Sequence, residues 1–173
     1  MKRQLKVFDF DDTLAKSETP VIIKKPDGSS ITLTPSQFAT YKMEPSDKLD
    51  FTYFNKMITK ATPIKHNVEL LKTYLANPGR YKVTILTARA LAFPIRYWLK
   101  KLTGRDVYVV GVAGSDPMLK ANYIEKEINK GYNDIVFIDD SIKNVKAVEA
   151  LASKYPDVTL KVIHTTEAEH IKF

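Results

Sequence analysis

The chain contains no cysteine among its 173 residues. Disulfide bridges, zinc-thiolate sites and catalysis by a thiol are therefore excluded. No hydrophobic run is long enough to span a membrane, and Asp9, Asp11 and Asp12 interrupt the apolar stretch near the basic start, so it cannot form the core of a signal peptide. These absences predict a protein of the reducing cytoplasm with no membrane partner.

The sequence also lacks internal repeats, low-complexity tracts and any Ser/Gly-rich linker that would separate two domains. With 44% hydrophobic residues, the chain can bury a sizeable core. We expect one domain over residues 1–173, and no obligate protein partner is evident. The net charge of +7 suits an anionic partner, whether a phosphorylated metabolite or a nucleic acid, and does not choose between them.

Short runs rich in β-branched residues alternate with helical patterns along the chain. The candidate strands cover residues 5–10, 82–86, 107–110, 135–138 and 158–163. This alternation predicts an α/β fold, a three-layer Rossmann-like core with a five-stranded parallel sheet. Ligands of such folds sit beyond the carboxyl ends of the strands, so function should be sought there.

The first full helix has clear boundary signals. Ile64, Val68 and Leu71 recur at helical spacing. Thr62 and Pro63 predict its start with a cap and a proline in the first turn, and residues 77–79 predict its end.

Residues 15–61 break the alternation and predict a small insert after the first strand. Residues 21–33 have the pattern of a hairpin with a turn at 26–29, where proline and glycine are favoured. Thr34 and the following proline open a short helix, and a second helix is expected over residues 50–59. The insert is therefore predicted to be a hairpin followed by helices.

Three carboxylates, Asp9, Asp11 and Asp12, lie within four residues directly after the first strand. Like charges this close destabilise one another unless a cation neutralises them. Polar groups that complement this acidic run follow the later strands. They are Thr87 and Arg89 after the second strand, Lys120 in the helix after the third, and Asp139, Asp140 and Asn144 after the fourth.

Each of these groups alone has an ordinary interpretation as a helix cap or a solvated side chain. Together, however, they bring a hydroxyl, a guanidinium and an ammonium to the edge that carries the acids, and such groups can hold phosphate oxygens. The sequence therefore predicts a site at this edge.

With these four motifs, the chain resembles the haloacid dehalogenase-like superfamily over residues 5–163. The matching positions are the DxDxT motif at residues 9–13, the second-motif threonine Thr87, the third-motif lysine Lys120, and the fourth-motif pair Asp139 and Asp140 with Asn144. The family often has glycine where Asp12 stands and aspartate where Asn144 stands. Aspartate tolerates positive φ and asparagine can orient a ligand or water, so both departures are compatible with the resemblance.

The resemblance implies a magnesium-dependent phosphomonoester hydrolase that works through an aspartyl-phosphate. Asp9 would attack phosphorus, and Asp11 would be the general acid/base. Thr87 and Lys120 would hold the transferring oxygens. Family members that cleave carbon–halogen bonds lack the second aspartate and the metal, so Asp11 favours phosphate chemistry.

The same resemblance implies a Mg²⁺ site and a set of substrate contacts. The expected metal ligands are Asp9, the backbone carbonyl of Asp11, Asp139 and Asp140, and which of the last two touches the metal directly stays open. The expected substrate contacts are Thr13, Arg89 and Asn144. The three histidines, His66, His164 and His170, have no partners at ligand spacing and are assigned no role.

A small insert would cover the active site incompletely, so phosphorylated ends of nucleic acids or nucleotides could enter. The pattern is similar to the 3′-phosphatase modules of nucleic-acid end-repair enzymes. The aromatic residues of the insert could stack bases, but a small core of their own is the favoured interpretation. These aromatic residues are Tyr41, Phe51, Tyr53 and Phe54. Outside the insert, a group of basic residues is interpreted first as the solvated side of a helix; its members are Arg96, Lys100, Lys101 and Arg105.

Three alternatives stay open. A small-metabolite phosphatase, acting for example on a sugar phosphate, would use the same groups. A phospho-receiver would carry an aspartate at the end of the third strand, where this chain has Gly111. A catalytically silent nucleic-acid-binding relative would not need Asp9 and Asp11.

Overall fold

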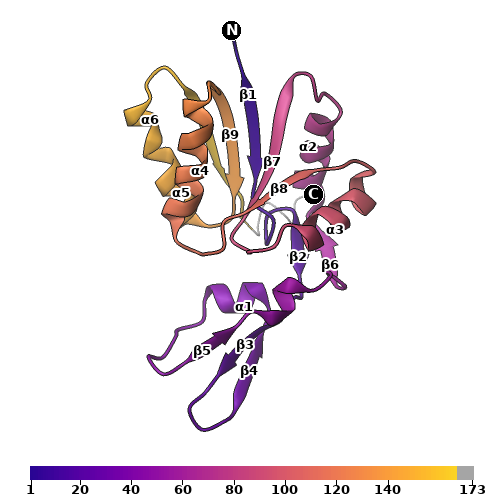
Figure 1. Cartoon of the computed structure of the whole chain (residues 1–173), viewed down its shortest axis with the longest axis vertical. Helices are drawn as coiled ribbons and strands as arrows, with labels where there is room; N and C mark the ends of the chain where they lie inside the picture. Colours follow the sequence, from indigo (N-terminus) through magenta and orange to yellow (C-terminus); the bar gives the residue numbers. More distant parts are fainter. Residues whose placement is uncertain (167–173) are drawn as a thin grey trace.

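The structure is a computed structural model in which residues 1–166 are described. Its centre is a five-stranded parallel sheet in the order β10-β9-β1-β7-β8 (Figure 1). The strands are β1 (Gln4–Phe8), β7 (Tyr81–Thr87), β8 (Tyr108–Gly111), β9 (Asp134–Asp139) and β10 (Thr159–His164). All five predicted strands are present, with ends shifted by one or two residues, and the predicted fold class is confirmed.

Helices cover both faces of this sheet. On one face lie α2 (Lys65–Leu75) and α3 (Phe93–Thr103), and on the other α4 (Pro117–Asn129), α5 (Ile142–Glu149) and α6 (Leu151–Lys154). The alternation of side chains along β1 explains the two cores. Leu5 and Val7 pack with α4 and α5, whereas Phe8 packs with α2 and α3. No helix within residues 1–166 combines the length and the apolar character needed to cross a membrane.

The predicted start of α2 is wrong. Thr62 and Pro63 lie in β6 (Ala61–Pro63), which pairs antiparallel with β2 (Ala15–Ser17), and α2 begins at Lys65. The two short strands are the two ends of the insert, and their pairing holds Thr62 and Pro63 extended. Tertiary pairing therefore overrides the local cap signal at these two residues.

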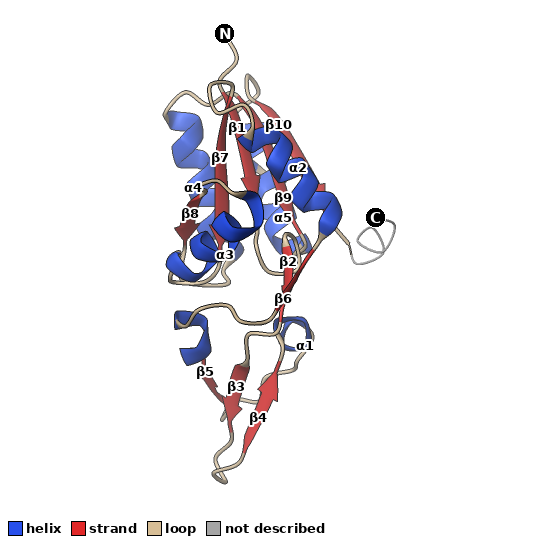
Figure 2. Cartoon of the chain, turned by 90° about the vertical axis from the view of Figure 1, so that its right-hand side faces the viewer, coloured by secondary structure: helices blue, strands red, loops and turns tan. Residues whose placement is uncertain are grey.

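The insert projects from the carboxyl end of the central sheet (Figures 1 and 2). It contains the three-stranded sheet β4-β3-β5 and the helix α1. Its elements are β3 (Val21–Lys24), β4 (Ser30–Leu33), α1 (Pro35–Ala39) and β5 (Lys48–Asp50). The predicted hairpin and the predicted short helix are both confirmed. At the start of α1 the Gln37 amide donates to the Thr34 hydroxyl, and the Thr34 amide donates to Oε1 of Gln37.

The helix predicted over residues 50–59 is wrong. Asp50 ends β5, and only a 3₁₀ turn, Thr52–Asn55, follows it. The Asp50 carboxylate accepts a bond from the Thr52 amide, which favours a turn over a helix interior. Phe51 packs its ring edge-on against Phe38 and Phe54, at centroid distances of 5.8 and 5.7 Å. Phe51 is nevertheless 44% exposed and Tyr53 is 41% exposed, so these rings contact one another without forming a buried core.

Candidate active site

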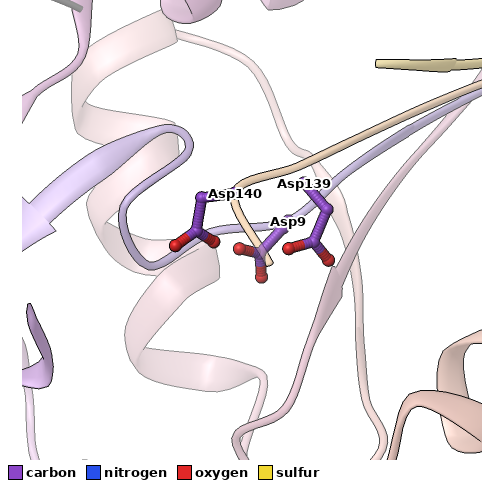
Figure 3. A group of neighbouring side chains, drawn as sticks. All are labelled: Asp9, Asp139 and Asp140. Atoms are coloured by element: carbon purple, nitrogen blue, oxygen red, sulfur yellow. The ribbon is translucent and has the colours of Figure 1, made fainter. Parts of the chain in front are cut away.

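Three aspartates meet at the carboxyl end of the central sheet (Figure 3). Asp9 follows β1, Asp139 ends β9, and Asp140 is the next residue. One carboxylate oxygen from each lies within 4.8 Å of one from each of the others. β1 and β9 are neighbours in the sheet, so their registered pairing brings together residues 130 positions apart in the chain.

Lys120 reaches this cluster from the first turn of α4. Its Nζ lies 2.8 Å from Oδ1 of Asp9 and 2.9 Å from Oδ2 of Asp139. All three side chains are buried. Burial disfavours the ammonium, but the two carboxylates outweigh it and raise the pKa of Lys120 above its ordinary value. The Asp116 side chain accepts a bond from the Met118 amide and so caps α4. This cap fixes the first turn of the helix, from which Lys120 extends.

The acidic charge of the cluster exceeds what Lys120 neutralises. Burial and the charge of Asp139 raise the pKa of Asp9 to about 6. Burial and the charge of Asp9 raise the pKa of Asp140 to about 10. Three converging carboxylates beside one ammonium repel one another, and a divalent cation would relieve that repulsion. Their oxygens are the hard ligands that such a cation prefers. The residues therefore fit the expected Mg²⁺ ion.

The side chain of Asp11 does not join this cluster and pairs with Arg89. Nε of Arg89 lies 2.8 Å from Oδ2 of Asp11, and Nη2 lies 2.6 Å from Oδ1. Nη2 also donates to the hydroxyls of Ser17 and Thr19 in the insert. The guanidinium carbon lies 4.4 Å from the ring centroid of Phe54, so Arg89 connects the core to the insert.

One donor of Arg89 is left over. Its buried Nη1 has no hydrogen-bond partner within residues 1–166. Buried donors are normally satisfied, because an unpaired one costs about 1–3 kcal/mol. An acceptor supplied by a ligand would remove this cost.

Two of the predicted substrate contacts bond to the carboxylates. Oγ1 of Thr13 donates to Oδ2 of Asp9 over 3.1 Å, and Nδ2 of Asn144 donates to Oδ2 of Asp139 over 3.0 Å. Both therefore orient the acidic cluster in this state. Thr87 is buried at the end of β7, and its hydroxyl accepts the amide of Arg89 over 3.1 Å.

Asp12 has a positive φ of 60°, a conformation that aspartate tolerates better than most residues. The amides of Thr13 and Leu14 bond back to the carbonyl of Phe10, which closes the turn. The Asp12 carboxylate accepts a bond from the Ser36 hydroxyl of α1 over 3.0 Å. The turn after the first motif therefore contacts the insert.

Sequence reasoning missed two residues near the cluster. Asn67 is buried in α2, and its Nδ2 donates to the carbonyl of Thr13 over 2.8 Å. Nε2 of His164 lies 2.9 Å from the carbonyl of Asp140. A polar residue on the apolar side of a helix is a signal that could have pointed to Asn67, whereas β10 brings His164 to the site only in the folded chain. His170 lies outside the described residues.

One pocket adjoins the acidic cluster, and a second lies next to it within the insert region. One, of about 310 Å³, is lined by Asp12, Asp140 and His164 with Lys16 and Ser36 of the insert region. The other, of about 590 Å³, shares Lys16 and Ser36 and includes Lys60. A ligand group larger than phosphate therefore has space beside the acidic cluster, in surroundings that include lysines.

No family model, curated protein or solved structure matches this chain. A function has to be inferred from the side chains at the site and from their geometry.

The pKa of Asp140 leads to a prediction about stability. Its ordinary value is 3.8 and its value in the folded chain is about 10, so between these pH values the unfolded chain gives up a proton that the folded chain retains. Without metal, this group therefore lowers stability increasingly as pH rises. Asp140→Asn removes the effect and should raise the midpoint of thermal unfolding by about 3 °C or more at about pH 8, and by little near pH 4.

Calorimetry in the presence of a chelator measures this difference. Mg²⁺ should then raise the midpoint of the wild type more than that of the variant. A gap between the two proteins that is the same at both pH values would contradict the assigned charge balance.

Proposed function

We propose that the chain is a magnesium-dependent phosphomonoester hydrolase that forms an aspartyl-phosphate on Asp9. The observation that supports it most strongly is the buried meeting of Asp9, Asp139 and Asp140 with Lys120 at the carboxyl end of a parallel sheet. The order of these groups along the chain supports membership of the haloacid dehalogenase-like superfamily.

Charge repulsion is the main obstacle to this reaction, because a carboxylate and a phosphate dianion are both anionic. Lys120 places a buried positive charge directly on the Asp9 carboxylate. A Mg²⁺ ion would be held by oxygens of Asp9, Asp139 and Asp140, and when bound it supplies further positive charge that offsets the repulsion. Thr13 and Asn144 fix the carboxylates in place.

The reaction proceeds in two steps that restore the enzyme. An oxygen of Asp9 bonds to phosphorus while the bond from phosphorus to the leaving oxygen breaks, and Asp11 donates a proton to that oxygen. Water then attacks phosphorus, Asp11 takes up a proton from the water, and inorganic phosphate leaves as the Asp9 carboxylate is regenerated.

Asp11 can take part only after it exchanges its bonds to Arg89, since both of its oxygens accept bonds from that guanidinium. The phosphate of the substrate offers the same kind of acceptor, and the unpartnered Nη1 of Arg89 is available to it once the pair opens. Arg89 therefore binds the substrate, and this exchange releases Asp11 for proton transfer.

The substrate class that the surroundings favour is a nucleotide or the phosphorylated end of a nucleic acid. The pocket beside Asp140 shares Lys16 and Ser36 with a second pocket in the insert region, which Lys60 also lines. The net charge of +7 also suits a polyanion.

Turnover of a generic aryl phosphate tests the proposed function. We expect release of phenol and inorganic phosphate with Mg²⁺, loss of turnover on exhaustive chelation, and recovery when Mg²⁺ is restored, because the acidic cluster offers oxygen ligands. Full turnover in the chelated protein would refute the metal dependence. Absence of turnover with Mg²⁺ for aryl phosphates, nucleotides and 3′-phosphorylated oligonucleotides alike would refute the hydrolase itself.

A further inference from the structure

The exposed face of α3 carries aromatic and basic side chains alone. Its exposed residues are Phe93, Arg96, Tyr97, Lys100 and Lys101. Spacings of three, one, three and one place them on one side of a helix. No acidic residue occurs anywhere in α3, whose sequence is FPIRYWLKKLT.

This face differs from an ordinary solvated helix side because it also exposes two aromatic rings. Phe93 is 64% exposed and Tyr97 is 46% exposed, although the helix already has an apolar side, where Ile95 and Leu99 are buried in the core. The rings of Phe93 and Tyr97 are neighbours, with centroids 6.3 Å apart. Nζ of Lys101 lies 4.6 Å from the Tyr97 centroid, so rings and charges form one continuous surface.

The positive charges on this face are mostly uncompensated. Lys100 pairs with Asp106 over 3.2 Å. Within residues 1–166, Arg96 and Lys101 have no carboxylate partner at ion-pair distance. The face therefore offers two unpaired cations next to two exposed rings.

The face also begins at the edge of the active site. α3 starts four residues after Arg89, whose guanidinium pairs with Asp11, and the exposed side chain of Leu91 lies in the intervening loop. Figures 1 and 2 show α3 at the end of the core from which the insert projects. With eleven residues, the helix extends for about 16 Å.

We propose that the α3 face binds single-stranded nucleic acid, with the terminal phosphate of that strand placed in the active site. Exposed bases stack on aromatic rings whatever their identity, while Arg and Lys pair with the phosphates between them. Alternating rings and cations match this repeat, and a polyanion complements the net charge of +7. This inference rests on the proposed phosphatase function and narrows its substrate class to single-stranded nucleic acid with a terminal phosphate.

Binding of labelled single-stranded DNA and RNA oligonucleotides without a terminal phosphate, followed by fluorescence anisotropy in the presence of a chelator, tests the face apart from turnover. Two double variants separate its two components. R96Q/K101Q should weaken binding about tenfold and reduce the slope of log affinity against log salt by about 1.4, at about 0.7 per lost phosphate contact. F93S/Y97S should weaken binding about tenfold with the slope unchanged.

The matched control is K126Q/K146Q, which removes the same charge from exposed positions of α4 and α5 on the opposite face of the sheet. It should change affinity by about twofold or less, and thermal unfolding should show that all variants are folded. Absence of oligonucleotide binding by the wild type would overturn the proposal. So would an equal loss in the control variant, or wild-type affinity in F93S/Y97S.

Failure of this inference can be told apart from failure of the proposed function. A protein that hydrolyses aryl phosphates but does not bind oligonucleotides contradicts the α3 face alone. A protein that binds oligonucleotides through α3 but hydrolyses no phosphomonoester contradicts the proposed function, and with it the placement of the strand's terminal phosphate in the active site.

Discussion

Asp9→Asn is expected to abolish hydrolysis of aryl phosphates, with a fall in kcat of at least about 10³-fold. The amide cannot form the phosphoryl bond on which both steps depend. The fold should persist because Lys120 keeps its second partner, Asp139, at 2.9 Å. Removing one of three crowded carboxylates also relieves the repulsion that raises the pKa of Asp140.

Steady-state kinetics with Mg²⁺ and calorimetry measure both parts of this prediction. Asp134→Asn is the matched control, since Asp134 begins β9 at the opposite end of the sheet and pairs with Lys2 over 3.6 Å. That variant should keep wild-type turnover. Wild-type turnover in Asp9→Asn would exclude Asp9 as the nucleophile, and loss of cooperative unfolding would show that its role is structural.

Asp11→Asn should separate the two chemical steps. Asp9 can still attack, but the water that hydrolyses the aspartyl-phosphate loses its general base. With an acidic phenol as leaving group, the first step needs little protonation. Rapid quenching should therefore show a burst of phenol approaching one equivalent per enzyme, followed by turnover slowed by about 10²-fold or more.

Arg89→Gln distinguishes this role of Asp11 from loss of its ion pair, because both substitutions break the contact between the two side chains. The Arg89 variant keeps the base and should show weakened substrate binding without a burst. Unchanged turnover without a burst in Asp11→Asn would mean that Asp11 is not the acid/base. A burst of the same size in both variants would mean that it results from loss of the ion pair between Asp11 and Arg89 and not from loss of a general base.

The central sheet and the position of the site could be predicted because both depend on patterns that are local in sequence. β1 and β9 are apolar runs that end in aspartates, and parallel pairing brings those ends to one edge. The positive φ of Asp12 is compatible with the sequence, because aspartate tolerates this conformation. Lys120 was predicted as a site residue from its place just after a helix start, which is also a local feature.

The contacts that could not be predicted depend on tertiary structure. Arg89 and Asp11 are 78 residues apart, and nothing in the sequence tells whether the guanidinium faces a ligand or this carboxylate. Thr62 was mispredicted as a helix cap because β6 pairs with the distant strand β2. The helix expected from Asp50 fails because Asp50 is paired with Ile22 of β3 and its carboxylate bonds to the Thr52 amide. Local propensity is weak compared with such pairing.

The most direct test of the account is to locate the phosphoryl group in quenched Asp11→Asn. After a single turnover with an aryl phosphate and Mg²⁺, acid quenching, proteolysis and mass spectrometry should find the mass of one phosphoryl group on the peptide that contains Asp9. Reductive cleavage of the acyl phosphate should place that group on Asp9 itself. A phosphoryl group on any other residue, or an unmodified Asp9 in a protein that shows the burst, would contradict the proposed mechanism.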